Sequence, residues 1–310
     1  MPRRVEFQQE LAEILGESRP FSYRHLSRLS NLGREELATF RKAWPATSRE
    51  RRQQVIQALL QLSEENTDLN FRDVFFCCLA DGEEEVRAAA IEGLWDDESC
   101  ALLERLLVVA VDDPSARVRC QALLTLSRFT YLIETADRWE EYRERTQRIL
   151  LSIWNEAGGP LEVRRRAIEA LGYLSSVPGV EESIVQAYSA PGREMRASAI
   201  HAMGHHLAER WRPAIERELA SPDPEMRFEA AQASGEMAEP SFVPHLASLL
   251  EDEDHEVARA AIWALGEIGG PQARRLLEHC LEETAEEDLR EAAEEALFTL
   301  RFFEDPLRLV

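Results

Sequence analysis

Hydrophobic and polar positions along this chain recur as one pattern in widely separated segments. Each copy has an apolar residue, then Arg in most copies, then Ala at the fifth position in most copies, then a small residue and an apolar residue two turns on. The steps between successive copies are 35, 32, 45, 32, 31, 31 and 32 residues. The copies begin at Arg51 (a degenerate copy), Val86, Val118, Val163, Met195, Met226, Val257 and Leu289. A two-helix repeat of this length cannot bury its apolar face alone, so the copies are expected to stack on one another.

Helix-start signals precede the copies. In DDPSARVR from Asp112, SPDPEMR from Ser221 and EDEDHEV from Glu251, Asp, Ser or Pro is placed to cap the following helix. Amphipathic stretches such as FVPHLASLLED and ARRLLEHCLEE lie between copies and indicate the first helix of each pair. No region is rich in predicted strands. The pattern therefore predicts an all-α solenoid of about eight two-helix repeats.

The repeated Val-Arg-x-x-Ala-x-x-Ala-Leu-Gly core resembles the HEAT repeat family, particularly the short bacterial class often called phycobilisome-lyase-like HEAT repeats. The resemblance extends from about Arg51 to Leu300. It implies a right-handed α-solenoid in which the second helix of each repeat lines a concave surface. The core is specific for this fold and for no activity.

The departures from the array define three further regions. Residues 1–50 are expected to form an N-terminal helical cap on the solenoid of residues 51–300, and residues 301–310 a C-terminal tail. Phe302 and Phe303 in that tail are expected to cover the last repeat, or else to form a short linear motif or an oligomer contact. The step of 45 residues indicates an insertion near 128–150. Its aromatic residues Tyr131, Trp139 and Tyr142, together with Phe129, either contact a partner or pack under a lengthened helix.

Helical geometry indicates which side chains line the concave surface. At about 100° per residue, pattern positions 1, 5, 8 and 9 form the core side, so positions 3, 7 and 10, with 11 at the edge, lie opposite. Glycine is usual at position 10, where it either ends the helix or permits close approach. In the middle repeats the predicted partner-binding row is Arg165, Glu169, Tyr173, His201, His205, Phe228, Gln232, Glu236, Arg259, Trp263 and Glu267.

Arginine recurs at position 2, and acidic residues such as Asp112, Asp223 and Asp252 precede several copies. We interpret this arrangement as a ladder of charge-assisted hydrogen bonds between adjacent repeats. The arginines are Arg87, Arg119, Arg164, Arg196, Arg227 and Arg290. The copy from Val257 has Ala258 at this position and Arg259 one place later, which frees Arg259 for the surface.

The net charge of −22, from 36 basic and 58 acidic residues, disfavours extended nucleic-acid binding. Residues 1–60 are Arg-rich and sum to about +4, so a nucleic-acid contact at the N-terminal end stays a minor alternative. The five cysteines include no CxxC pair, which argues against disulfides and zinc. No apolar segment approaches the length of a membrane span or signal peptide, so we expect a cytoplasmic protein without membrane contact.

Candidate metal ligands are few. Deoxyhypusine hydroxylases are HEAT-type enzymes that hold iron with His-Glu pairs at positions 3 and 4, and MRFEAAQASG from Met226 resembles such a unit with Phe228 in place of histidine. No copy has histidine at position 3, so we interpret Glu229 as a helix flank. His201 and His205 are spaced i, i+4, with Glu236 in the next repeat, and are weak metal candidates.

The sequence contains no GxSxG, GxxxxGK[ST] or GxGxxG motif. We therefore expect a non-enzymatic scaffold or adaptor that binds another protein on its concave face and needs no cofactor. The alternative is a metal- or small-ligand-dependent enzyme or accessory protein that uses the His201/His205 region. The pattern identifies neither the partner nor the oligomeric state.

Overall fold

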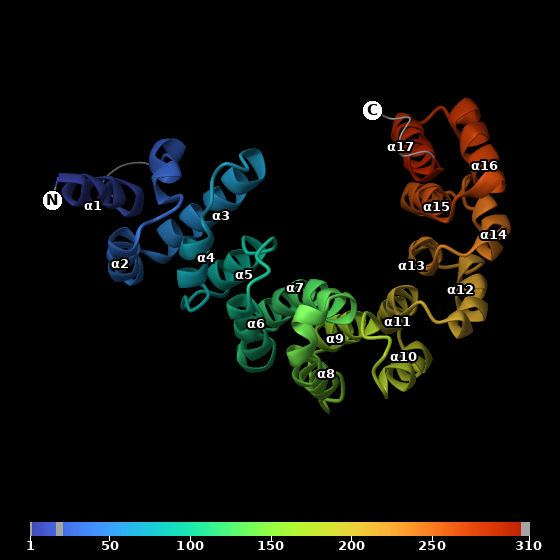
Figure 1. The fold of residues 1–310 in the computed structure, drawn as a ribbon, viewed down its shortest axis with the longest axis horizontal. Helices are drawn as coiled ribbons and strands as arrows, with labels where there is room; N and C mark the ends of the chain where they lie inside the picture. The colour runs from blue at the N-terminus through green and yellow to red at the C-terminus, as the bar shows by residue number, and fades with distance from the viewer. Residues whose placement is uncertain (1, 17–20, 305–310) are drawn as a thin grey trace. The chain divides into compact units, whose positions relative to one another are not determined.

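The computed structural model describes residues 2–16 and 21–304 of the 310-residue chain (Figure 1). Over these residues it contains 17 α-helices, five short 3-10 helices and no strand. None of the described helices is both long and apolar enough to span a membrane.

The helices alternate along the chain between first and second members of eight pairs within the described ranges. The pairs are α2 (Arg34–Ala43) with α3 (Arg49–Glu65), α4 (Arg72–Cys78) with α5 (Glu84–Glu92), α6 (Cys100–Asp112) with α7 (Ala116–Thr135), α8 (Glu140–Trp154) with α9 (Leu161–Gly172), α10 (Val180–Ser189) with α11 (Arg193–His206), α12 (Arg212–Leu219) with α13 (Pro224–Met237), α14 (Val243–Ala247) with α15 (His255–Ile268), and α16 (Gly270–Glu283) with α17 (Glu287–Glu304). One copy of the sequence pattern begins in the second member of each pair. The predicted all-α solenoid of about eight two-helix repeats is confirmed.

The remaining elements precede or connect these pairs. Helix α1 spans Pro2–Leu15, and the 3-10 helices are η1 (Tyr23–Leu29), η2 (Trp44–Ala46), η3 (Asp137–Trp139), η4 (Glu209–Trp211) and η5 (Pro240–Phe242). The buried side chains of Phe7, Leu11 and Ile14 lie on α1, which packs against α2, η1 and α3. The N-terminal segment thus shares a core with the first repeat.

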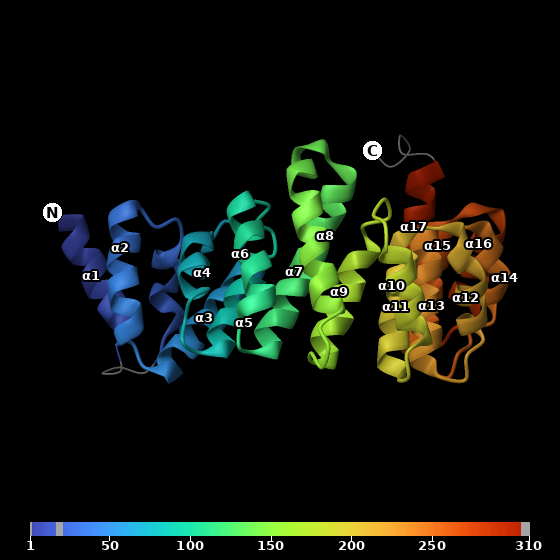
Figure 2. The same ribbon diagram turned by 90° about the horizontal axis from the view of Figure 1, so that it is seen from below.

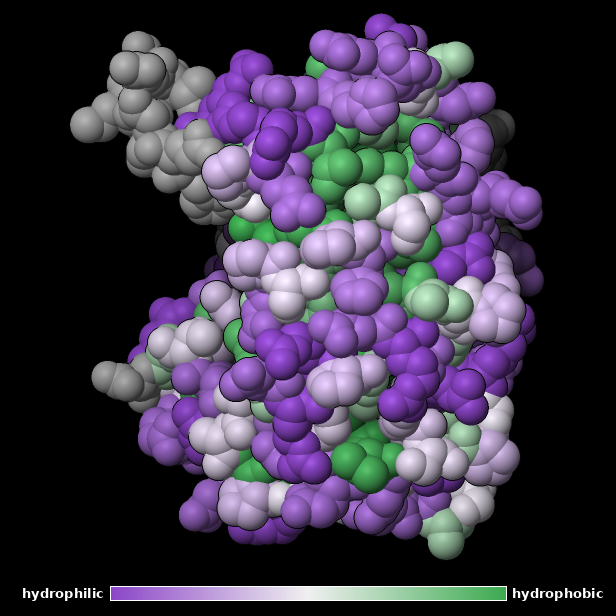
Figure 3. All heavy atoms as spheres, turned by 90° about the vertical axis from the view of Figure 1, so that its right-hand side faces the viewer, coloured by the Kyte–Doolittle hydropathy of each residue, from purple (hydrophilic) through white to green (hydrophobic). Residues whose placement is uncertain are grey.

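The chain forms two compact units, Met1–Phe129 and Thr130–Val310, which divide within α7 at the predicted insertion. In the second unit α9, α11, α13, α15 and α17 stack in series and form what we call the inner layer (Figures 1 and 2). Helices α10, α12, α14 and α16 form the outer layer of the same unit. Hydrophilic side chains predominate on the face of this outer layer, with hydrophobic ones between them (Figure 3).

Close contacts at glycine set the spacing of the inner helices. A Cβ on Gly204 would lie 2.7 Å from the Cα of Ala233 on the next inner helix, and one on Gly172 would lie 2.7 Å from the Cα of Ala202. Gly204, Gly235 and Gly266 all lie inside their helices rather than at the ends. These three glycines therefore permit close approach of neighbouring helices and do not end the helix.

Two of the position-2 arginines, Arg227 and Arg87, pair with an aspartate of the next repeat. Both guanidinium nitrogens Nε and Nη2 of Arg227 donate to Asp252 at 2.7 Å, and those of Arg87 donate to Asp113 at 2.8 Å. The partner of Arg87 is thus the neighbour of Asp112. Three others bind main-chain carbonyls of their own repeats, Arg119 that of Ala110, Arg164 that of Trp154 and Arg290 that of Thr284. The Arg196 guanidinium lies 5.9 Å from the Tyr188 ring centroid. The ladder is consequently partial.

The insertion lengthens α7 to 20 residues and supplies η3 before α8. Trp139 is 2% exposed, so it packs in the core and cannot serve as the partner contact that the sequence indicated. Tyr142 is half-buried, with its ring 5.8 Å from that of Trp139, whereas Tyr131 is 53% exposed. Tyr131 therefore remains accessible and Tyr142 partly so, and their role in partner binding stays a prediction.

Helix α17 continues to Glu304, so the first residues of the predicted tail are helical. Residues 305–310, and the side chains of Phe302 and Phe303, lie outside the described part of the structure. The prediction that these two phenylalanines cover the last repeat therefore stays a prediction.

Candidate functional site

The predicted row lies along the inner layer of the second unit, on α9, α11, α13 and α15 or directly after α9. Glu236 and Arg259 are exposed, Glu169 is buried, and the other members are half-buried. The structure gathers the row into two groups. We call the first, around His201 and His205, the histidine cluster, and the second, around Trp263, the Trp263 recess.

The histidine cluster comprises Tyr173, His201, His205, Glu229 and Glu236. The Tyr173 ring stacks on the His205 ring with centroids 4.2 Å apart, and its hydroxyl lies 3.0 Å from Nε2 of His205. Nδ1 of His205 is 3.5 Å from a carboxylate oxygen of Glu236, and Nδ1 of His201 is 3.5 Å from one of Glu229. With the His205 proton on Nδ1 facing Glu236, Nε2 accepts from the Tyr173 hydroxyl.

The electrostatics of this cluster keep Tyr173 protonated and favour the charged form of His201. Burial, together with Glu236 and Glu169, raises the pKa of Tyr173 to about 12. Burial lowers the pKa of His201, but the hydrogen bond and charge of Glu229 outweigh it, so the pKa lies above its ordinary value. The hydrogen bond from His205 lowers the pKa of Glu236 despite burial. Each histidine thus has one carboxylate partner.

Glu169 is buried by its own contacts and is not an accessible part of the row. Ser198 Oγ donates to it at 2.6 Å, and Arg166 Nη1 donates at 2.5 Å. Arg165 Nε in turn donates to Ser198 Oγ at 2.9 Å. Glu169 therefore links α9 to α11, and the prediction that it contacts a partner does not fit its 8% exposure.

Among the described residues, His201 and His205 belong to no group of three metal-ligand side chains. Within residues 2–16 and 21–304, one group of three His, Cys, Asp or Glu side chains brings its ligand atoms within 4.8 Å of one another. That group is His255, Glu286 and Asp288, all exposed, at the starts of α15 and α17. The two histidines of the predicted row do not belong to it.

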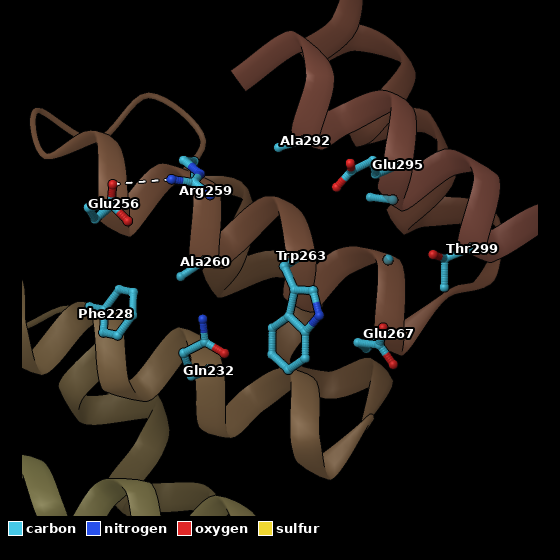
Figure 4. Close-up of a pocket in the computed structure, with 12 residues that line it drawn as sticks. Phe228, Gln232, Glu256, Arg259, Ala260, Trp263, Glu267, Ala292, Glu295 and Thr299 are labelled. Atoms are coloured by element: carbon cyan, nitrogen blue, oxygen red, sulfur yellow. Dashed lines mark hydrogen bonds and ion pairs between the residues drawn. The ribbon is translucent and has the colours of Figure 1, made fainter. Parts of the chain in front are cut away.

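The Trp263 recess is a hollow of about 410 Å³ between α13, α15 and α17 (Figure 4). Trp263 stands in it, with Phe228 and Gln232 on α13 and Glu295 and Thr299 on α17. Small residues give the recess its depth, since no long side chain fills these positions. They are Ala260, Gly266, Ala292 and Ala296.

The recess has an excess of negative charge. Its one arginine, Arg259, is paired with Glu256 at 3.3 Å (Figure 4). Glu267 and Glu295 have neither a hydrogen bond nor an ion pair to any other described residue. Burial, with a contribution from Glu236, raises the pKa of Glu267, as expected for a carboxylate without a compensating cation.

Several side chains at equivalent pattern positions lie outside the predicted row, because the row covers only the middle repeats. Position 7 of the last copy is Glu295 and position 11 is Thr299, and both line the Trp263 recess. In the first unit, Leu124 is position 7 of the copy from Val118, and Trp95 is position 10 of the copy from Val86. Their side chains are 41% and 42% exposed. They line a separate hollow of about 480 Å³ there.

Four arginines near the basic N-terminal end are paired within the described part of the chain. Arg28 Nε lies 2.8 Å from Glu10, Arg49 Nε lies 3.0 Å from Glu83, and Arg52 Nε lies 3.3 Å from Asp81. Arg41 Nε donates to Cys77 Sγ at 3.1 Å. These internal pairs weaken the nucleic-acid alternative.

Comparisons with known proteins agree with this architecture. A family model described as HEAT repeats matches residues 212–297, and it does not single out the phycobilisome-lyase-like class. No curated protein sequence matches the chain.

Similar solved structures are repeat proteins of low sequence identity. Kap95p, from a structure with RanGDP, is 16% identical with a TM-score of 0.54 over 96% of this chain and 45% of Kap95p. YibA of Escherichia coli is 17% identical with a TM-score of 0.47 over 92% of this chain and 99% of that one. A designed armadillo repeat protein is 18% identical with a TM-score of 0.38 over 63% and 98%. Residues 212–297 of this all-α solenoid thus match the HEAT repeat model.

Proposed function

We propose that this chain is a non-catalytic scaffold that binds a partner protein on the inner layer of its second unit. The observation that carries the proposal is the Trp263 recess, in which the aromatic side chains of Phe228 and Trp263 on α13 and α15 lie beside the unpaired carboxylates of Glu267 and Glu295 on α15 and α17. Aromatic anchors in partly desolvated pockets supply much of the binding energy at protein interfaces. The outer layer, by contrast, is mostly hydrophilic (Figure 3).

The packing of the inner layer favours such a role because it makes the surface rigid. Glycine-to-alanine contacts between successive helices leave little room for sliding, as at Gly204 and Ala233. A preorganised surface loses less conformational entropy when a partner binds. Side chains on successive helices are thereby held at fixed separations.

The chemistry of the histidine cluster supports a non-catalytic role. A tyrosine that acts as base or nucleophile near neutral pH needs a lowered pKa. The pKa of Tyr173 is instead raised to about 12, because the phenol is buried beside carboxylates. Tyr173, His205 and Glu236 then act as a set of contacts that join α9, α11 and α13.

Kap95p, a solenoid with the same fold, is described in complex with RanGDP. Its similarity to this chain concerns the fold alone, so it provides a precedent for protein binding and no indication of the partner.

Affinity capture from native cell extract tests the proposal. The bait is the wild-type chain, the inner-layer variant Phe228→Ser/Trp263→Ser, or the outer-layer variant Glu278→Ser/His279→Ser on α16. We expect a protein that the wild-type and outer-layer baits retain and the inner-layer bait loses, with circular dichroism showing all three baits folded. Equal capture by all three baits would place binding elsewhere on the chain.

A further inference from the structure

Trp263 differs from the other tryptophans in the kind of group that contacts its indole ring. Four of the six have an arginine guanidinium 4.9 to 5.9 Å from the ring centroid, namely Trp95, Trp139, Trp154 and Trp211. Trp44 stacks on Phe40 with centroids 5.0 Å apart. No cation or aromatic ring among the described residues covers Trp263, although its side chain is only half-buried.

The charges around this ring attract a cation. Glu267 lies one turn after Trp263 on α15, and Glu295 lies on the facing helix α17 (Figure 4). The single nearby arginine, Arg259, is already paired with Glu256. An apolar occupant would desolvate the two free carboxylates without pairing them, whereas a cation would compensate both.

We propose that the Trp263 recess binds an arginine or lysine side chain from a basic segment of the partner protein, with the cation over the indole and paired with Glu267 and Glu295. This inference rests on the proposed function, since it assigns the chemistry of the partner that the inner layer binds. A tryptophan face is the strongest aromatic site for such cations. The hollow left by the small residues admits the long aliphatic stem of either side chain.

The first unit contains this arrangement within the chain itself. The Arg128 guanidinium lies 5.9 Å from the Trp95 ring centroid, and its Nη1 is 3.9 Å from a carboxylate oxygen of Glu98. Its Nη2 also donates to the carbonyl of Asp97 at 2.9 Å. In the first unit the chain itself supplies the indole, the carboxylate and the guanidinium. The Trp263 recess has an indole and carboxylates, and it lacks only the cation.

The test uses the full chain and a synthetic twelve-residue peptide of alternating arginine and serine, with a glutamate-serine peptide as control. The readout is the indole N–H resonance of Trp263, assigned by its loss in Trp263→Phe. Titration at physiological ionic strength screens the long-range attraction of a chain with a net charge of −22.

We expect the arginine-serine peptide, and not its acidic counterpart, to shift this resonance saturably. Glu267→Gln/Glu295→Gln should weaken the interaction about fivefold to thirtyfold, and Trp263→Ala should weaken it similarly by an independent readout such as calorimetry. The matched control Glu278→Gln/Glu282→Gln removes equal charge from exposed positions on α16 and should retain wild-type affinity.

The cation assignment would be overturned if the peptide did not move the Trp263 resonance. It would also be overturned if Glu267→Gln/Glu295→Gln and Glu278→Gln/Glu282→Gln weakened peptide binding equally. Partner capture that depends on Phe228 and Trp263 would then still support the scaffold function. The two proposals therefore fail separately.

Discussion

The indole of Trp263 lies against Gly235 of the preceding inner helix, where a Cβ would come within 2.4 Å of ring atom Cζ3. The same glycine position brings neighbouring helices together elsewhere in the layer, as at Gly204 and Ala233. Glycine at position 10 thus has two effects. It allows neighbouring inner helices to pack closely, and at Gly235 it sets the position of the Trp263 indole in the proposed binding surface. Its two effects are separable by mutation.

Gly204→Ala should lower the free energy of unfolding. The added Cβ meets the backbone of Ala233 at 2.7 Å, which cannot move without shifting α13, so overpacking of about 1–3 kcal/mol outweighs a helix-propensity gain of about 1 kcal/mol. Gly82→Ala is the matched control, because a Cβ there meets nothing within 4 Å. Thermal unfolding followed by circular dichroism checks this, and equal midpoints for the two variants would refute the close-approach account.

Gly235→Ala should act mainly on the binding surface. The nearest atoms belong to the half-exposed Trp263 ring, which can rotate away toward solvent, although the Cα of Ala264 at 3.0 Å adds some strain. We expect the indole N–H resonance of Trp263 to move and partner capture to weaken. An unchanged resonance in a folded Gly235→Ala variant would contradict the contact between this glycine and the ring.

Arg227→Ala should destabilise the second unit by about 3 kcal/mol, because it leaves the nearly buried Asp252 carboxylate without its bidentate partner. The hydrogen bond from Arg227 lowers the pKa of Asp252. A lowered folded-state pKa means that the stabilisation is present above the unfolded value of about 4 and is lost as pH falls through the folded value.

The stability difference between wild type and Arg227→Ala should therefore shrink as the pH is lowered below about 4. Urea unfolding of both chains at a series of pH values measures it. If the difference in the free energy of unfolding stayed constant across this pH range, the ion pair would not stabilise the fold.

The Glu229→Gln variant should lower the pKa of His201. Glu229 is what raises that pKa against the effect of burial, so removing its charge leaves burial dominant. In the wild type the raised pKa stabilises the fold fully below about pH 6.5, and this contribution is lost as pH rises through the folded pKa. Histidine NMR titration of the two chains provides the comparison, with Glu278→Gln as a distant control, and identical His201 titrations would contradict the pairing.

Much of the fold was predictable from the sequence because stacking requires each repeat to have the same apolar positions. Val163, Met195 and Met226 occupy equivalent core sites, so their spacing alone reveals the helix pairs. Helical periodicity likewise placed Trp263 and Phe228 on the inner layer. Helical periodicity predicts which way a side chain points, but it does not predict which groups that side chain contacts.

The failures follow from that limit. Glu169 points along the predicted face, but Ser198 and Arg166 from within the layer bind its carboxylate and bury it. Trp139 lies in an insertion without a repeat register, so no periodicity indicated its burial. Trp95 occupies position 10 of the copy from Val86 but lies outside the predicted row, which covers the middle repeats alone.

Site-specific photocrosslinking tests the central claim most directly. A benzoylphenylalanine at Phe228 probes the inner layer with little change in shape, and one at the exposed His279 probes the outer layer of the same unit. The account predicts that native extract yields a protein crosslinked from position 228 and absent from position 279, and that Trp263→Ala weakens this crosslink. No crosslink from position 228, or the same products from both positions, would contradict it.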